Sequence, residues 1–204
     1  MMRVGRPYAD AYRKALEEFA RADPAMMAAC CGGSYRRERG VLELSYCGAP
    51  VRASHPSGEV ECDTLELTGA EVVLVLQYLA GARGFPPVGR WVSFLELPGG
   101  PHHYDLFRRE AVERIARRFG DRPEELVERA GRLGGTPART GSASASIPAF
   151  HGIPLLAVVW GGDEEFPPSA NLVFDAGSHR ALPTASLYVL GIEVSKRLCG
   201  EGGP

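Results

Sequence analysis

The stretch that most constrains the fold runs from Ile153 to Asp175 and reads IPLLAVVWGGDEEFPPSANLVFD. Residues 153–160 form an apolar run whose length is typical of a buried strand and short for a helix. A Gly-Gly pair, three successive acids and a Pro-Pro pair follow before a second apolar segment at Asn171–Phe174. This pattern predicts an antiparallel hairpin with a long acidic loop at its tip.

The rest of the chain predicts helices and shorter strands that cover this hairpin. Apolar residues recur at three- and four-residue steps over 7–22, 112–119 and 187–198, which indicates amphipathic helices. Thr68-Gly69-Ala70-Glu71 has the pattern of a capping box and predicts a helix up to Gly81 or Gly84. We therefore predict an α+β fold: an antiparallel sheet built on a central hairpin (about 153–175), packed by roughly four or five helices.

Length and composition limit the class of protein. A chain of 204 residues, of which 45% are hydrophobic, fits a single domain over 1–204. The formal charge of −2 gives no electrostatic reason to expect nucleic acid or an anionic membrane surface as a partner. The start of the chain lacks the apolar core of a secretory signal, and no apolar run approaches the roughly 20 residues of a membrane span. We expect a soluble, cytoplasmic protein.

Cysteine usage and motif content leave the chemistry open. The five cysteines lack C-x-x-C spacing, which argues against a disulfide framework and a zinc knuckle. Adjacent Cys30 and Cys31 fit either a redox or soft-metal pair or two small buried apolar residues. The chain has no G-x-S-x-G, Walker, H-E-x-x-H or G-x-G-x-x-G motif, so no cofactor is predicted from motifs.

The acidic loop is the first candidate site. Asp163, Glu164 and Glu165 are candidate ligands for a hard cation such as magnesium or calcium, with Asp175 at the end of the returning strand. One carboxylate with a raised pKa among these neighbours is a candidate general acid. The structural alternative is that the acids hold the loop by accepting backbone N–H bonds and pair with arginines.

Two other groups of residues are candidates. His102 and His103 lie near Asp105, a combination that can bind a metal or form a catalytic pair; alternatively, Asp105 caps the next helix. A set of four aromatic residues either forms the floor of a pocket for a flat ligand or packs in the core. Its members are Trp91, Phe94, Tyr104 and Trp160.

An ordered set of short motifs carries a resemblance to a known family. The residues are Leu76-Gln77-Tyr78-Leu79, Gly89-Arg90-Trp91-Val92-Ser93-Phe94, Glu96-Leu97, Gly99-Gly100, Phe107, Phe119-Gly120, Leu133-Gly134-Gly135, Trp160, Gly162-Asp163-Glu164-Glu165-Phe166, Leu172, Phe174-Asp175 and Leu182-Pro183-Thr184. From about Tyr8 to Leu198, the chain resembles an uncharacterised family of bacteria and archaea, domain of unknown function 3786. Some relatives carry iron–sulfur-type cysteine segments, which implies redox or one-carbon metabolism for them; this chain has no such segment. It also departs from the family at Ala143–Ser146 and Ala185, where acids are expected.

Two functional hypotheses follow. In the first, a binding or accessory module grips a small ligand or protein partner through the loops near Trp91 and Asp163. Its candidate ligand-binding residues are Trp91, His103, Trp160, Asp163, Glu165 and Asp175. In the second, a metal-assisted enzyme uses the Asp163–Glu165 loop.

Overall fold

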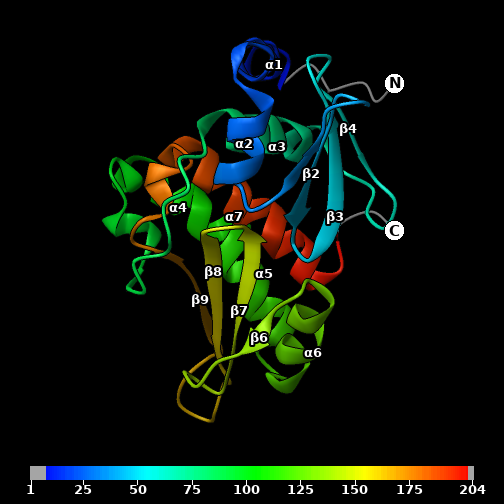
Figure 1. Cartoon of the computed structure of the whole chain (residues 1–204). Coiled ribbons are helices and arrows are strands. Elements are labelled where there is room, and N and C mark those ends of the chain that lie inside the picture. The colour runs from blue at the N-terminus through cyan, green and yellow to red at the C-terminus, as the bar shows by residue number, and fades with distance from the viewer. Residues whose placement is uncertain (1–7, 202–204) are drawn as a thin grey trace.

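The computed structural model describes residues 8–201, which form an α+β arrangement with two antiparallel sheets (Figure 1). The predicted fold class is confirmed, whereas the sequence predicted one sheet and the structure has two. The strands are β1 (Ser34–Arg36), β2 (Val41–Tyr46), β3 (Ala49–Ser54), β4 (Glu59–Cys62), β5 (Trp91–Val92), β6 (Thr136–Pro137), β7 (Ala143–Phe150), β8 (Ile153–Trp160) and β9 (Ser169–Asp175). The helices are α1 (Ala9–Arg21), α2 (Pro24–Cys30), α3 (Gly69–Gly81), α4 (Tyr104–Phe107), α5 (Glu113–Phe119), α6 (Glu124–Arg132) and α7 (Thr184–Cys199).

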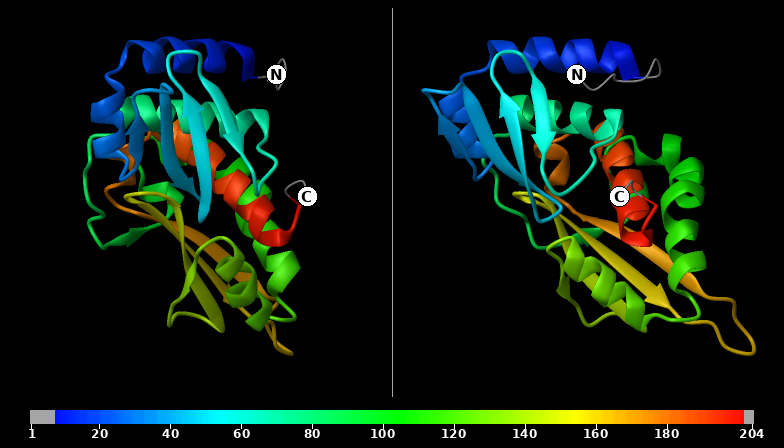
Figure 2. Two further views of the ribbon diagram at one scale, coloured as in Figure 1. Left: turned by 45° about the vertical axis from the view of Figure 1, so that its right-hand side comes forward. Right: turned by 90° about the vertical axis from the view of Figure 1, so that its right-hand side faces the viewer.

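The predicted hairpin is the centre of the larger sheet, whose order is β5-β9-β8-β7-β6. Leu155 pairs with Phe174 at one end of the hairpin, and Trp160 pairs with Ser169 at the other. Helix α5 packs on β8 and β9, and α6 packs beside β6 and β7. The loop at the hairpin tip projects from the end of this sheet, away from α1 and the smaller sheet (Figures 1 and 2).

The segment 131–146 is poor in large apolar residues, which predicts a flexible loop leading into a strand near 147–150, but the structure differs. It contains β6 and the first part of β7, with Thr136 paired to Ser146. Ala145 and Ser144 are buried because β7 lies inside the sheet, between β6 and β8. Small side chains suit this position, but they give no strong hydrophobic alternation in the sequence.

Helix α3 lies between α1 and α7 and is buried on nearly all sides (Figure 2). The predicted capping box is confirmed: Thr68 Oγ1 accepts a hydrogen bond from Glu71 N at 3.2 Å, and Glu71 Oε2 accepts one from Thr68 N at 2.8 Å. The sequence predicted one apolar face, but Val73 and Leu74 are buried as well. A helix that is apolar all round belongs in a core.

The smaller sheet has the order β1-β2-β3-β4. The sequence Cys47-Gly48-Ala49-Pro50 predicts a turn over all four residues. The observed β2–β3 turn is only Cys47 and Gly48, both with positive φ (48° and 76°). Positive φ at both positions suits the right-handed twist of a tight hairpin. Cys47 N donates to Ala149 O at 3.0 Å, so this turn also joins the smaller sheet to β7 of the larger one.

The pair Asp23-Pro24 predicts the end of α1, because a residue before proline is disfavoured in a helix, and it gives no prediction of α2. The same pair also starts α2: Asp23 Oδ1 accepts hydrogen bonds from Ala25 N and Met26 N, and Pro24 occupies the first turn. Proline at this position loses no helical hydrogen bond, and its φ is already helical. Among the helices of residues 8–201, none combines the length and apolar character that crossing a membrane needs.

A buried ion pair connects the two halves of the fold. Arg197 on α7 donates from Nε and Nη2 to the carboxylate of Glu71 on α3, and the two side chains are 5% and 0% exposed. Tyr46 Oη on β2 donates to Glu71 Oε1 at 2.9 Å. Burial raises the pKa of Tyr46 well above its ordinary range, so this phenol remains a donor. The network fixes α7 against α3 and the smaller sheet.

Candidate functional site

The predicted site residues lie at opposite ends of the larger sheet. Trp91 pairs with Asp175 at one end of β9, and Trp160 pairs with Ser169 at the other end. At about 3.3 Å per strand residue, these ends are about 20 Å apart. The loop near Trp91 and the loop around Asp163 therefore do not share one cavity.

Asp175 positions the loop that precedes Trp91. Its side chain is 1% exposed. Its Oδ1 accepts hydrogen bonds from Val88 N at 2.9 Å and Gly177 N at 2.8 Å, and its Oδ2 accepts one from Gly89 N at 2.7 Å. With its oxygens bonded to backbone, Asp175 holds the chain in place.

Asp163 shapes the hairpin tip in a similar way. Its Oδ1 accepts hydrogen bonds from Glu165 N at 2.9 Å and Phe166 N at 2.8 Å. These bonds, first that from Phe166 and then that from Glu165, lower the pKa of the Asp163 carboxyl. Their stabilisation is therefore fully present above the ordinary aspartate pKa and is lost as the pH falls through the lowered value. Glu164 and Glu165 are exposed, and residues 8–201 contain no cluster of three or more histidine, cysteine or acidic side chains suited to a metal ion.

The other candidates are also separated. His103 is exposed, with its ring centroid 5.8 Å from that of Tyr188. Asp105 does not cap the next helix, which begins at Tyr104 without a side-chain cap and carries Asp105 in its first turn. Phe94 is buried and stacks on Phe107 at a centroid distance of 4.4 Å, so it belongs to the core.

The cysteines are free thiols. Cys31 is buried, and its Sγ donates to Ala28 O at 3.6 Å. Burial raises the pKa of this thiol, which reduces the thiolate fraction that redox or metal chemistry needs. Cys30 is half-buried.

The double change Asp163→Asn with Glu165→Gln tests the role of the tip acids. We expect a melting temperature close to that of the wild type and faster hydrogen exchange at the amides of Glu165 and Phe166. A neutral amide oxygen is a weaker acceptor than a carboxylate, and the affected bonds lie in an exposed loop. Glu164→Gln is the matched control, because that carboxylate makes no hydrogen bond within residues 8–201. Unfolding of the double variant would show that the acids stabilise the whole fold.

The same double variant checks the metal hypothesis. If the loop binds magnesium, manganese or calcium, the added ion raises the wild-type melting temperature and leaves the variant unchanged. Superimposable melting curves with and without each ion would remove the metal-assisted enzyme from consideration.

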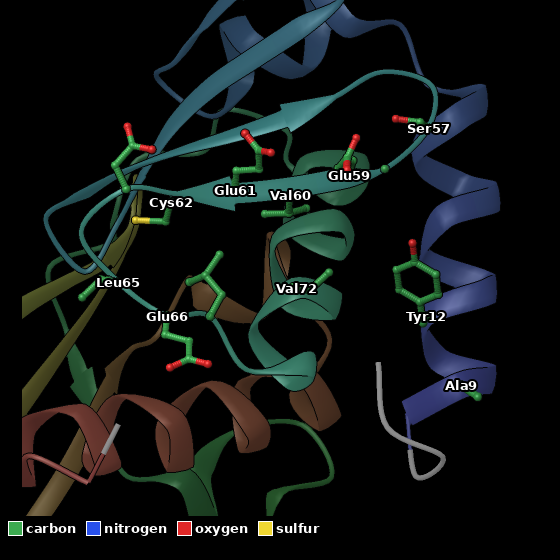
Figure 3. A pocket seen from close by; sticks show the side chains of 13 residues that line it. Ala9, Tyr12, Ser57, Glu59, Val60, Glu61, Cys62, Leu65, Glu66 and Val72 are labelled. Carbon is green, nitrogen blue, oxygen red and sulfur yellow. The ribbon is translucent and has the colours of Figure 1, made fainter. Parts of the chain in front are cut away.

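A cavity of about 1200 Å³ lies elsewhere, in a groove between α1 and β4 (Figure 3). We call it the α1–β4 groove. Its floor is apolar and includes Val60, Leu67 and Val72. Tyr12 on α1 forms part of the opposite wall, and the segment 63–67 closes one end.

Local interactions fix the walls of the groove. Helix α1 rests on the β3–β4 turn, where the rings of Phe19 and His55 meet edge to face at 5.2 Å. Gly58, at φ +69°, allows this approach, because a Cβ there would lie 2.3 Å from Leu16 Cδ1. The position of His55 beside the Pro56-Ser57-Gly58 turn predicts a surface residue, but the structure shows it in the packing under α1.

The closing segment is held at both of its ends. Arg52 donates two hydrogen bonds to Asp63, at 2.7 and 2.6 Å. The hydrogen bonds and charge of this guanidinium lower the pKa of the Asp63 carboxyl, which favours its charged form. Arg197 Nη2 donates to Glu66 O at 2.8 Å. The groove therefore has a preformed shape, which reduces the entropic cost of binding.

Acids surround the groove. Glu59, Glu61, Asp63 and Glu66 line it, and Arg52 is the basic side chain paired with Asp63 and close to Glu61 (3.7 Å). Glu59 and Glu66 are exposed and form no ion pair with another residue of the described chain. The groove thus offers an apolar floor and uncompensated negative charge.

The sequence contains a signal for this groove that the prediction did not use. The run Glu59-Val60-Glu61-Cys62-Asp63 alternates acids with apolar residues. In a strand, such alternation places all the acids on one face. From the sequence alone, residues 60–67 are predicted only to be extended. The position of α1 opposite this segment depends on tertiary packing.

The fold and this groove define an α+β protein with two linked antiparallel sheets and a preformed surface cavity. The chain belongs to the family described as Domain of unknown function (DUF3786), whose model matches residues 23–197. The resemblance found in the sequence is therefore confirmed. Comparison with curated proteins and with solved structures found no match to the chain.

Proposed function

We propose that this protein is a binding or accessory module that grips a cationic ligand or partner in the α1–β4 groove. The observation that supports it is the apolar floor of a groove of about 1200 Å³ beside Glu59 and Glu66, which have no ion-pair partner in residues 8–201. Clefts of this size that combine apolar lining with a few placed polar groups are typical of ligand sites. A ligand with an apolar body and a positive charge complements both features.

The groove supports this function better than the loops near Trp91 and Asp163. Those loops lie at the two ends of β9, and the carboxylates of Asp163 and Asp175 already accept backbone hydrogen bonds. The hairpin tip exposes Phe166 (67%) and Trp160 (42%), which gives a protein partner a second, smaller set of apolar contacts. The groove is enclosed on more sides and is the stronger candidate.

A pair of small probes of opposite charge tests the proposal. We expect 4-phenylbutylamine to shift amide NMR signals around Tyr12, Val60 and Leu65, and 4-phenylbutyrate, which has the same apolar part, to leave them unchanged. Replacing Glu59 and Glu66 by glutamine should weaken amine binding about two- to fivefold, since each exposed charge contact contributes about 0.2–0.5 kcal/mol.

The matched control replaces Glu38 and Glu124, which are exposed and remote from the groove, by glutamine. It changes the net charge by the same amount and should bind the amine as the wild type does. Equal binding of the two probes, or signal shifts scattered over the surface, would contradict the proposed function.

A further inference from the structure

One wall of the α1–β4 groove is the open edge of a sheet. Strand β4 ends the order β1-β2-β3-β4, and within residues 8–201 no strand pairs with its outer side. The groove is lined by consecutive residues, 57–63, along this edge, and by Ala9 and Tyr12 of α1 on the other side. A free strand edge facing a helix across a groove is a geometry that accepts an added strand.

The side chains of β4 define what such a strand must carry. In Figure 3 the carboxylates of Glu59 and Glu61 lie on one side of β4, and Val60 lies on the other, toward α3. Side chains of an added strand would also alternate between the two faces of the sheet. Every second side chain would lie next to the acids, and the others would lie next to the apolar floor. Basic residues complement the first set of positions, and apolar residues complement the second.

The row of acids also has a simpler explanation, because charge on an edge strand prevents pairing with another copy of the same chain. That explanation accounts for the acids but not for the groove, whose apolar floor at Val60 and Val72 lies along the same edge. Repulsion between copies and attraction of a basic strand are compatible, since both follow from the same negative edge. A single acidic row can therefore exclude self-association and select the partner.

We propose that the occupant of the α1–β4 groove is an extended segment of a partner protein, with alternating basic and apolar residues, that pairs with β4 as a fifth strand of the smaller sheet. This inference rests on the proposed function and adds the mode of binding to it. Backbone hydrogen bonds to β4 supply the pairing, and the alternation supplies the selectivity.

N-methylated peptides test the mode of binding. The probe is acetyl-Lys-Val-Lys-Val-Lys-Val-amide, and two derivatives carry N-methyl groups on all lysine amides or on all valine amides. Alternate amides of a strand point to opposite edges, so only one derivative blocks pairing with β4. We expect one derivative to bind at least tenfold more weakly than the parent and the other to stay within about threefold of it. Backbone amides of 59–62 that face the groove should exchange hydrogen more slowly with the parent peptide bound.

The controls separate this inference from the proposed function. One set of results would overturn strand pairing alone. In it, the parent peptide binds, the double change Glu59→Gln with Glu61→Gln weakens its binding, and the two methylated derivatives have equal affinities. The proposal of a cation-binding groove would then still hold. If acetyl-Glu-Val-Glu-Val-Glu-Val-amide binds as well as the lysine peptide, both proposals fail. A dimer in sedimentation experiments that the peptide disrupts would assign the edge to a second copy of this chain, and it would also overturn the inference.

Discussion

Replacing Glu71 by alanine is expected to lower the free energy of unfolding by about 3–5 kcal/mol, because Arg197 then remains buried without its counter-charge. The change also removes the acceptor of the Tyr46 hydroxyl and one half of the capping box of α3. Chemical denaturation, followed by the helical circular dichroism signal, measures this loss.

The matched control is Glu128→Ala on α6. Its partner Arg132 lies at 2.7 Å, but the two side chains are 69% and 63% exposed, and such a pair contributes at most about 1 kcal/mol. Replacing both buried partners, as in Glu71→Leu with Arg197→Met, should recover much of the stability, since no buried charge is left unpaired. A loss below about 1 kcal/mol for Glu71→Ala would contradict the assigned role of the pair.

Leu76→Ala should cost about 2–5 kcal/mol, the range for truncating a fully buried leucine. Leu76 is 0% exposed in α3, which packs against α1, α2 and α7, so its neighbours have little freedom to fill the cavity. Leu106, at 42% exposure, provides the control: Leu106→Ala should change the stability by roughly 0.5 kcal/mol or less. A denaturation midpoint for Leu76→Ala within error of the wild type would place α3 outside the core.

Local patterns predicted those elements whose stabilising interactions are close in sequence. The hairpin 153–175 followed from an apolar run, turn residues and a second apolar segment, and the start of α3 followed from Thr68 and Glu71, which bond to each other. Both signals depend on neighbours within a few residues. Tertiary context was not needed to find them.

Other elements depend on partners that are distant in sequence. Strand β7 is rich in alanine and serine and is stabilised by β6, β8 and α6, so its own residues gave little periodic signal. The apolar residues of 41–46 and Val51, on either side of the Cys47–Pro50 turn residues, predict the pairing of β2 with β3, but they do not predict that β1 and β4 extend this pair into a separate sheet. The separation of the candidate residues depends on such distant partners as well: Trp91 pairs with one end of β9, and Asp163 lies in the loop before its other end, which only the strand register shows.

The ion pair between Glu71 and Arg197 has a consequence for the synthesis of the protein. Its partners are 126 residues apart in the chain, so the smaller sheet and α3 leave the ribosome well before α7 has been made. Until α7 has been made, Glu71 lacks its ion-pair partner Arg197, and α3 lacks one of the helices that cover it. The first half of the chain must therefore wait in an incompletely folded state, and a product that stops before α7 exposes an apolar helix to chaperones and proteases. Position along the chain thus makes α7 the element whose synthesis completes the core.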